Sequence, residues 1–354
     1  MKRIIVCAGG TGGHVFPALE LCDQLNAEDY DCILLTDLRG RRFCDKTQVK
    51  CQVIPEISSS IKSLARSIIN AVRIVVALGM SWKKDRPSAV IGFGGVMTIL
   101  PLLIARMMKI PYIIHEQNSI PGRANRLLAR LGAVATSNFE IKGYNKVATP
   151  VRREIQAVAA SVYEPIRNGR FVLTIIGGSQ GAAIFTRIVP LAIEMLPVKI
   201  RKILTIVQQT DFETVETLTK IYNELEVKNR VVNFIHDMDN VLVNSSLVIC
   251  RSGASTINEL ATIGRPAIFI PYPYAADNHQ KRNAEIIEDL GGGWVINEAS
   301  LSPKIIASKI EDLIYSKDQL SLSAVNMLRS RSISANTELK KIIINGGTSE
   351  IVSN

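Results

Sequence analysis

Residues 3–18 read RIIVCAGGTGGHVFPA, a short apolar run that stops at a cluster of glycines and continues into a helix-like pattern. The same plan returns at residues 171–182, which read FVLTIIGGSQGA. A strand, a glycine turn and a helix begin a βα unit, the building block of open parallel sheets. One such unit in each half of the chain predicts an α/β protein with two doubly wound, Rossmann-like domains.

Further apolar runs of strand length fit parallel sheets with crossover helices, because helical patterns separate most of them. These runs are residues 33–35, 89–91, 112–115, 203–207, 231–234, 247–250 and 267–270. A chain of 354 residues exceeds the size of a single core, and a polar, Pro-bracketed segment at residues 149–169 suggests the linker. We therefore expect an N-terminal domain over residues 1–155 and a C-terminal domain over residues 165–327.

The net charge of +10 lies entirely in the N-terminal half. Residues 1–155 hold 22 Lys and Arg against 12 Asp and Glu, and the rest of the chain is balanced. An excess of this kind indicates an anionic partner, either nucleic acid, an anionic membrane or a diphosphate, although a solvated basic face explains it equally well. The basic, apolar stretch Ile61–Lys84 fits a membrane interface, but on sequence alone an ordinary crossover helix is favoured.

No apolar run approaches the roughly 18–20 residues needed to cross a bilayer, and the first residues lack the pattern of a signal peptide. We therefore expect a cytoplasmic chain. The six cysteines form no C-x-x-C pair, which predicts reduced structural thiols and favours neither a zinc site nor a disulfide framework.

The two glycine turns match neither a dinucleotide fingerprint nor a Walker A loop. Backbone N–H groups at a helix N-terminus favour phosphate, although a structural tight turn explains the glycines as well.

Three polar runs also follow predicted strands, where open α/β sheets bind their ligands. They are residues 115–118, HEQN; residues 251–259, RSGASTINE; and residues 271–280, PYPYAADNHQ. Glu259 could accept hydrogen bonds from a ribose diol. It could equally cap its own helix, because Thr256 and Glu259 have capping-box spacing and residues 264–266 supply a helix stop.

Together these runs resemble one family, the undecaprenyl-diphospho-muramoylpentapeptide N-acetylglucosaminyltransferases of glycosyltransferase family 28. The matching motifs lie in order along nearly the whole chain, at residues 9–18, 94–95, 115–118, 177–182, 234–235, 251–254, 279–280 and 283–284. The resemblance implies the glycosyltransferase B (GT-B) fold, in which two Rossmann-like domains face each other across a cleft. It places the acceptor in the N-terminal domain and UDP-GlcNAc mainly in the C-terminal one. It also implies a C-terminal helix, at about residues 328–350, that packs back on the first domain.

The same resemblance implies an activity. GlcNAc would pass with inversion from UDP-GlcNAc to the 4-OH of MurNAc-pentapeptide-diphospho-undecaprenol (lipid I), which forms lipid II for peptidoglycan, cell wall biogenesis, cell shape and cell division. The protein would be peripheral on the cytoplasmic face of the anionic inner membrane, with partners in a cell-wall synthesis assembly.

Site residues follow by motif, again as what the resemblance implies. The donor-binding residues are Thr11, Gly12, Gly13, Asn118, Arg152, Ser179, Ile235, Arg251, Ala254, Ser255, Glu259 and Gln280. Thr11–Gly13 and Asn118 would face the donor sugar and diphosphate, and Ile235 would contact uracil through its backbone. Two motifs depart from the family pattern: Gly-Asn-Pro-Val-Arg reads Ala148-Thr149-Pro150-Val151-Arg152, and Gly-Gly-Tyr reads Gly94-Gly95-Val96.

An inverting transfer needs a base for the acceptor hydroxyl and stabilisation of the leaving UDP. His14, in the first turn, is the first candidate for the base; His115 and Glu116 compete with it, and we name His14 and Glu116 as catalytic. His236 and His279 lie on the donor side and are poor candidates. Because no carboxylates cluster, we expect no cofactor and no metal on the diphosphate. Helix N-termini at Ser179 and Ser255, with Arg251 or Arg152, would stabilise UDP instead.

Other functions remain open from the residues alone. A transferase for another lipid or aglycone, or a UDP-GlcNAc 2-epimerase, would share the architecture. A non-catalytic UDP-sugar sensor would bind the donor without turnover. A nucleic-acid binder is disfavoured, because only 5% of residues are aromatic and no recognition motif is present.

Overall fold

The computed structural model describes residues 1–45, 47–55, 64–177, 183–331 and 335–346. It divides into two compact units. Unit 1 holds Met1–Arg152 and the C-terminal segment from residue 332, and unit 2 holds Arg153–Arg331. The division falls slightly before the predicted boundary at residue 155. Residues 328–330 belong to the last helix of unit 2, so the helix that returns to unit 1 begins later than expected.

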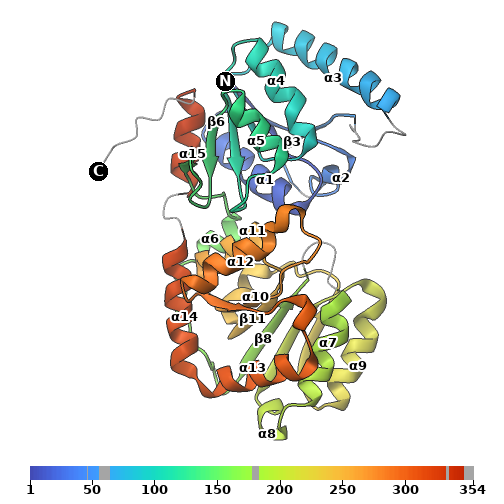
Figure 1. Cartoon of the computed structure of the whole chain (residues 1–354), viewed down its shortest axis with the longest axis vertical. Helices are drawn as coiled ribbons and strands as arrows, with labels where there is room; N and C mark the ends of the chain where they lie inside the picture. Colours follow the sequence, from blue (N-terminus) through green and yellow to red (C-terminus); the bar gives the residue numbers. More distant parts are fainter. Residues whose placement is uncertain (46, 56–63, 178–182, 332–334, 347–354) are drawn as a thin grey trace. The chain divides into compact units, whose positions relative to one another are not determined.

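Unit 1 contains a parallel sheet with helices packed around it (Figure 1). The sheet has seven strands, in the order β3-β2-β1-β4-β5-β6-β7. Its strands are β1 (Arg3–Cys7), β2 (Asp31–Thr36), β3 (Lys50–Val53), β4 (Ala89–Gly92), β5 (Tyr112–Glu116), β6 (Val134–Ser137) and β7 (Asn145–Lys146). The strand order reverses between β1 and β4. The loops after these two strands therefore flank the switch point, where sheets of this kind bind ligands.

Helices cover both faces of this sheet. They are α1 (Gly12–Asn26), α2 (Leu38–Arg41), α3 (Leu64–Lys84), α4 (Ile99–Met107), α5 (Arg123–Arg130) and α15 (Ala335–Ile344), with the 3-10 turn η2 (Val96–Thr98). Ile4 and Val6 of β1 pack into a core with α1 and α15, whereas Ile5 and Cys7 pack into a core with α3, α4 and α5. The alternation of side chains along β1 thus divides the apolar core into two layers.

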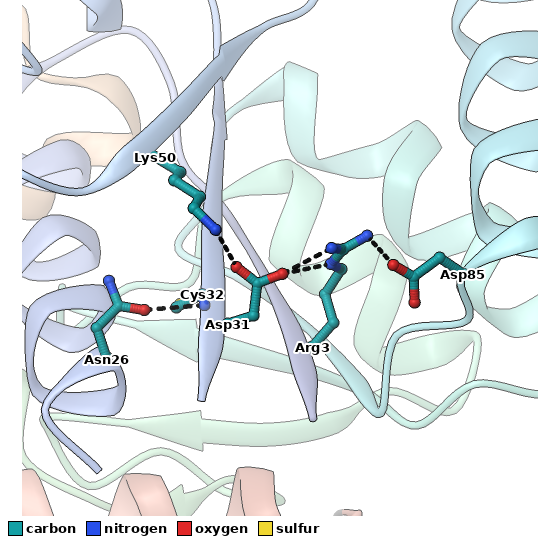
Figure 2. A network of polar contacts seen from close by, with 6 residues as sticks. All are labelled: Arg3, Asn26, Asp31, Cys32, Lys50 and Asp85. Carbon is teal, nitrogen blue, oxygen red and sulfur yellow. Dashed lines mark hydrogen bonds and ion pairs between the residues drawn. The ribbon is translucent and has the colours of Figure 1, made fainter. Parts of the chain in front are cut away.

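A polar network ties the strands of unit 1 at their amino ends (Figure 2). The Asp31 carboxylate, at the start of β2, accepts hydrogen bonds from Lys50 Nζ at 2.6 Å and Arg3 Nε at 2.8 Å. Arg3 also pairs with Asp85, just before β4. These cations, Lys50 first, lower the pKa of Asp31. The network lies at the opposite end of the sheet from the glycine turn, so it joins β1, β2 and β3 without entering the edge where such sheets bind ligands.

Unit 2 contains a six-stranded parallel sheet in the order β10-β9-β8-β11-β12-β13. Its strands are β8 (Phe171–Ile176), β9 (Leu204–Gln209), β10 (Lys228–Val232), β11 (Leu247–Cys250), β12 (Ala267–Phe269) and β13 (Gly293–Val295). The order reverses between β8 and β11, so this unit repeats the switch point of unit 1.

The helices of unit 2 are α6 (Arg153–Ala157), α7 (Ala183–Glu194), α8 (Val198–Arg201), α9 (Val215–Glu224), α10 (Met238–Asn244), α11 (Ala254–Ile263), α12 (His279–Asp289), α13 (Pro303–Tyr315) and α14 (Lys317–Ser330). Three 3-10 turns, η3 (Phe212–Thr214), η4 (Ala276–Asn278) and η5 (Glu298–Ser300), complete it. The main core joins β8, β9 and β11 to α7, α9 and α13.

Three chemical features of the described residues bear on function. No described helix is long and apolar enough to cross a bilayer. The six cysteines are free thiols, as expected. Within the described ranges, His, Cys, Asp and Glu side chains do not gather in groups of three that could hold a metal ion.

Candidate active site

The first glycine turn, between β1 and α1, is held in place from outside. Gly10 has a φ of 83°, and its N–H donates to Oδ1 of the buried Asp37 at 3.2 Å. A Cβ added to Gly9 would lie only 2.4 Å from Cγ of Met97, which explains why this position has no side chain. The predicted residues Thr11 and Gly13 are exposed at the start of α1. The turn thus presents a fixed backbone to solvent at the switch point.

His14 is half-buried on the first turn of α1. Its Nδ1 lies 3.2 Å from the carbonyl oxygen of Gly9. A carbonyl can only accept, so Nδ1 carries the proton in the neutral ring and Nε2 keeps its lone pair. Gly94 and Gly95 lie against the ring, and a Cβ added to Gly94 would be 3.4 Å from Nε2. The lone pair of Nε2 is therefore not used by the Gly9 carbonyl, and Gly94 and Gly95 place no side chain beside the ring.

His115 has a different environment and does not suit the role of base. It is fully buried at the end of β5, and its Nε2 lies 2.8 Å from the Thr149 hydroxyl. Its Nδ1 lies 3.0 Å from the hydroxyl of Thr136, which itself donates to the Ile114 carbonyl. Nδ1–H must therefore donate to Thr136, and Thr149 must donate to Nε2. Burial lowers the pKa of His115 to about 3, so this ring is a neutral structural link.

The buried ring predicts a pH-dependent stability of unit 1. The pKa of His115 in the folded chain lies below its usual value of 6.5, so the unfolded chain binds a proton that the folded chain excludes. The stabilisation is complete above about pH 6.5 and falls as the pH drops toward 3, by up to about 1.4 kcal/mol per pH unit.

Denaturant titrations between about pH 5 and 6.5, a window above most carboxylate titration, should show this slope in the fluorescence of Trp82. A Trp294→Phe background isolates that signal. His115→Gln should flatten the slope, and an unchanged slope would contradict the assignment.

Thr149 is one of the two departures from the family pattern, and its contacts account for it. The side chain is 2% exposed, and its N–H donates to Asn138 Oδ1 at 3.1 Å in addition to the hydroxyl bond with His115. The threonine therefore belongs to the hydrogen-bond network of unit 1. Val96, the other departure, starts η2 and is half exposed beside Gly95.

Glu116 organises a loop. Oε1 accepts from the backbone N–H and the Nδ2 of Asn118, at 3.0 and 3.2 Å. Oε2 accepts from Gly122 N at 3.0 Å and from Asn125 Nδ2 at 2.8 Å. The carboxylate is only 2% exposed and meets four donors, so its contacts suit the positioning of Asn118 better than proton transfer.

Two further residues lie close to the glycine turn and to Gly94, and no local sequence pattern predicts them. Asp37 lies 27 residues from the Gly10 that it holds. Asn125, 1% exposed on α5, lies beside Gly94, where an added Cβ would be 3.5 Å from its Nδ2. Gly94 therefore connects the surroundings of His14 with those of Glu116.

In unit 2, the second glycine turn with the predicted Ser179 lies outside the described residues. The loop after β11 is described, and Gly253 is the N-cap of α11. Ala254 and Ser255 are the first helical residues, so Glu259 lies in the second turn of the helix. This excludes the capping-box alternative for Glu259, because that role requires the third helical position. Gly264, with φ of 70°, ends the helix as predicted.

The loops after β11 and β12 form one hydrogen-bonded layer. Ser252 Oγ donates to the Gln280 carbonyl at 2.8 Å, and Asn283 Nδ2 donates to the Ser252 carbonyl at 3.3 Å. Gln280 Oε1 accepts from Tyr272 N at 3.0 Å. Arg251 is engaged in the same layer: NH1 donates to the carbonyls of residues 270 and 271 and lies 2.5 Å from Glu298. These contacts favour a loop-positioning role for Arg251 over a first contact with phosphate.

Two predicted donor-site residues remain, Ile235 after β10 and Arg152 in unit 1. The Ile235 side chain is buried with Val207 and Val241, and no hydrogen bond among the described residues uses its backbone N–H or carbonyl. The whole residue is 1% exposed, so this unused donor and acceptor lie beneath the surface of the loop. Arg152, half-buried, is the last residue of unit 1 before the division.

Comparisons with known proteins agree with this geometry. The model of the glycosyltransferase family 28 N-terminal domain matches residues 4–135, and that of the family 28 C-terminal domain matches residues 172–339. A UDP-N-acetylglucosamine–N-acetylmuramyl-(pentapeptide) pyrophosphoryl-undecaprenol N-acetylglucosamine transferase of Sinorhizobium fredii is 39% identical over 341 residues, 91% of this chain and 90% of the relative. The protein of the same description from Rhizobium meliloti is 40% identical over 91% of this chain and 89% of the relative.

Solved structures extend the likeness. Acinetobacter baumannii MurG superposes with a TM-score of 0.82 at 26% identity and covers 98% of this chain and 100% of its own. The glycosyltransferase VinC shares only the fold, with a TM-score of 0.68 at 12% identity, over 98% of this chain and 99% of its own. The predicted GT-B class, with a Rossmann-like sheet in each unit, is confirmed. The chain belongs to glycosyltransferase family 28.

Proposed function

We propose that this chain transfers GlcNAc from UDP-GlcNAc to the 4-OH of the muramoyl sugar in a lipid-linked diphosphate acceptor, lipid I, and so forms lipid II. The descriptions of its relatives support this substrate pair. The observation that carries the chemistry is His14, whose Nδ1–H donates to Gly9 and whose Nε2 keeps a lone pair at the switch point of unit 1.

The reaction is an inverting displacement. The acceptor oxygen attacks C1 of GlcNAc from the face opposite UDP, the C1–O4 bond forms, and the bond between C1 and the β-phosphate oxygen breaks. His14 Nε2 takes the hydroxyl proton and later releases it to water. The Gly9 carbonyl then stabilises the imidazolium through Nδ1–H. In this scheme Asn118 contacts UDP-GlcNAc, and Glu116 positions it by accepting hydrogen bonds from its backbone N–H and its Nδ2.

UDP departs with extra negative charge, which hydrogen-bond donors or cations of the protein have to stabilise. We assign this role to the backbone N–H groups at the first turn of α11, to Arg152 and to Ser179. We expect no divalent ion in contact with the diphosphate. Glu259 binds the ribose diol in this scheme, and Gln280 binds the GlcNAc hydroxyls.

Transfer of labelled GlcNAc to a short-chain lipid I analogue tests the proposal, with and without EDTA. We expect a β1→4-linked product that persists in EDTA. Folded protein that binds UDP-GlcNAc but transfers nothing to this acceptor would contradict the assignment and leave a sensor or another acceptor. Release of UDP with formation of ManNAc would indicate an epimerase instead.

The surface of α3 fits a peripheral location on an anionic membrane. Residues 61–63, at the start of the predicted stretch, lie outside the described residues. On α3, Ile74, Leu78 and Trp82 are buried in the core, as in an ordinary crossover helix. The opposite face exposes Ile68, Ile69, Val72, Val76 and Met80 together with Arg66, Arg73, Lys83 and Lys84. An exposed apolar stripe with basic neighbours and no acidic residue is typical of helices that lie in a bilayer interface. We therefore include the cytoplasmic face of the inner membrane in the proposal.

Loss of this apolar stripe should weaken binding to phosphatidylglycerol vesicles. The double variant Val72→Gln, Val76→Gln removes two exposed apolar side chains and should lower vesicle affinity by roughly tenfold or more. Sedimentation with vesicles measures the affinity. The matched control replaces Leu191 and Met195, exposed apolar residues of unit 2, by glutamine. Equal losses in the two variants would contradict a specific role for α3.

A further inference from the structure

A short arginine-bearing segment covers the first glycine turn. Arg39 lies on α2, and its guanidinium NH2 is 3.2 Å from Oδ2 of Asp37. The same nitrogen would be 3.6 Å from a Cβ added to Gly10, so the guanidinium lies over the turn itself. The Arg39 side chain is 64% exposed, whereas its carboxylate partner is only 5% exposed. A cation is thus held at the surface by a buried anion that also accepts a hydrogen bond from Gly10 N of the turn.

This arrangement is rigid on both sides. Asp37 Oδ1 accepts from Gly10 N at 3.2 Å and from Gly40 N at 2.8 Å, which ties the turn and α2 to one carboxylate. The ring of Phe43, just after α2, packs edge-on against Phe16 of α1 at 5.0 Å. The guanidinium is therefore placed before any ligand arrives, which lowers the entropy lost when it binds one.

The neighbouring arginines are engaged differently. Arg41 pairs with Asp45 along its own segment at 3.4 Å, and Arg42 stacks on the ring of Phe43 at 4.7 Å. Their partners do not belong to the glycine turn. Arg39 is distinguished because its carboxylate also binds Gly10, and a planar guanidinium of this kind suits bidentate contact with phosphate oxygens.

Two diphosphates take part in the proposed reaction, one in each substrate, and position favours that of the acceptor. The acceptor diphosphate is attached to C1 of the sugar whose 4-OH meets His14, so it lies within one sugar ring of the base. His14 is in the helix that this turn opens. The same unit carries the α3 surface, and a diphosphate that joins a prenyl chain to a sugar has to lie between the bilayer and the reacting hydroxyl.

We propose that Arg39, oriented by Asp37 over Gly10, binds the diphosphate of the lipid-linked acceptor. This inference rests on the proposed function and adds a substrate-binding residue to it. Asp37 is the positioning residue of the pair: it sets both the guanidinium and the backbone of the turn.

Steady-state kinetics with two acceptors test the inference. One is a short-chain lipid I analogue, and the other carries an uncharged linker of similar length in place of the diphosphate. Arg39→Gln should raise KM for the diphosphate acceptor by roughly 10- to 100-fold, the size of a lost charge-assisted contact. It should leave KM for UDP-GlcNAc and the activity toward the uncharged acceptor unchanged. Arg39→Lys should have a KM for the diphosphate acceptor between those of the wild type and Arg39→Gln. Lysine keeps the positive charge but lacks the paired N–H groups of the planar guanidinium.

Arg41→Gln is the matched control on the same helix and should behave as the wild type. An Arg39→Gln effect on the donor KM, an equal effect on both acceptors, or the same effect in Arg41→Gln would overturn the inference. If the wild type transfers to neither acceptor, the proposed function fails. Calorimetry with a short-chain prenyl diphosphate then decides about Arg39 separately: weaker binding by Arg39→Gln supports its role, and equal binding overturns it.

Discussion

Replacement of His14 by alanine is expected to lower kcat for GlcNAc transfer by roughly 10²- to 10⁴-fold, the usual contribution of a positioned general base. The imidazole is fixed by the Gly9 carbonyl, which leaves Nε2 as the proton acceptor. Since the proton moves only in the transition state, the loss should fall on kcat, with both KM values changed little. Initial rates at saturating donor and acceptor measure the effect.

His14→Gln is the sharper variant, because the amide fills part of the ring's space beside Gly94 without acting as a base. It should be as inactive as His14→Ala, because the amide cannot take the hydroxyl proton. His236→Ala, on an exposed loop of unit 2, provides a histidine control and should retain kcat. A His14→Gln protein with more than about a tenth of the wild-type kcat would exclude the ring as the general base.

The central strands of both sheets were predictable because they are buried on both faces and read as unbroken apolar runs. The edges of the sheets were not. β3 and β7 include exposed residues such as Lys50 and Lys146, and β7 has only two residues, so neither forms an apolar run. The predicted strand 231–234 was wrong in its bounds: β10 covers Lys228–Val232, and its first three residues are not buried.

The residues of the candidate site likewise fall into two groups: those that neighbouring residues in the sequence predict, and those whose role depends on residues far away in the sequence. The glycine turn and His14 are visible in 16 consecutive residues, because strand, turn and helix are neighbours in sequence. The environment of His115 cannot be recognised from neighbouring residues, because its hydrogen-bond partners Thr136 and Thr149 lie 21 and 34 residues away in the sequence. The sequence alone ranks His14 only modestly ahead of His115 as the base, whereas burial and hydrogen bonding separate the two rings clearly. For Asp37 the same limit applies, because its role depends on a turn that precedes it by 27 residues.

Arg265→Met is expected to lower the free energy of unfolding of unit 2 by about 3 to 5 kcal/mol, the range for a broken buried polar network. The guanidinium is fully buried, and all its hydrogen-bond partners are uncharged. Nε and NH2 donate to the carbonyls of Leu242 and Val243 at the end of α10. NH1 donates to those of Ile263 and Gly264 at the end of α11. One cation therefore caps two helix C-termini, where carbonyls lack intrahelical partners and the dipole is negative.

The same guanidinium also fixes the segment that precedes β8, because NH2 donates to Ser161 Oγ at 3.0 Å and the group stacks on Tyr163. Denaturant titration followed by Trp294 fluorescence in a Trp82→Phe background reports unit 2, since the chain has only these two tryptophans. Arg265→Lys should recover part of the loss, because an ammonium keeps the charge but cannot reach all the carbonyls. Arg170→Met is the matched control. Its guanidinium donates to the Lys202 carbonyl from an exposed position, so its loss should cost no more than about 0.5 kcal/mol. If Arg265→Met were as stable as that control, the carbonyls would have found other donors, and the two helices would not depend on a shared cation.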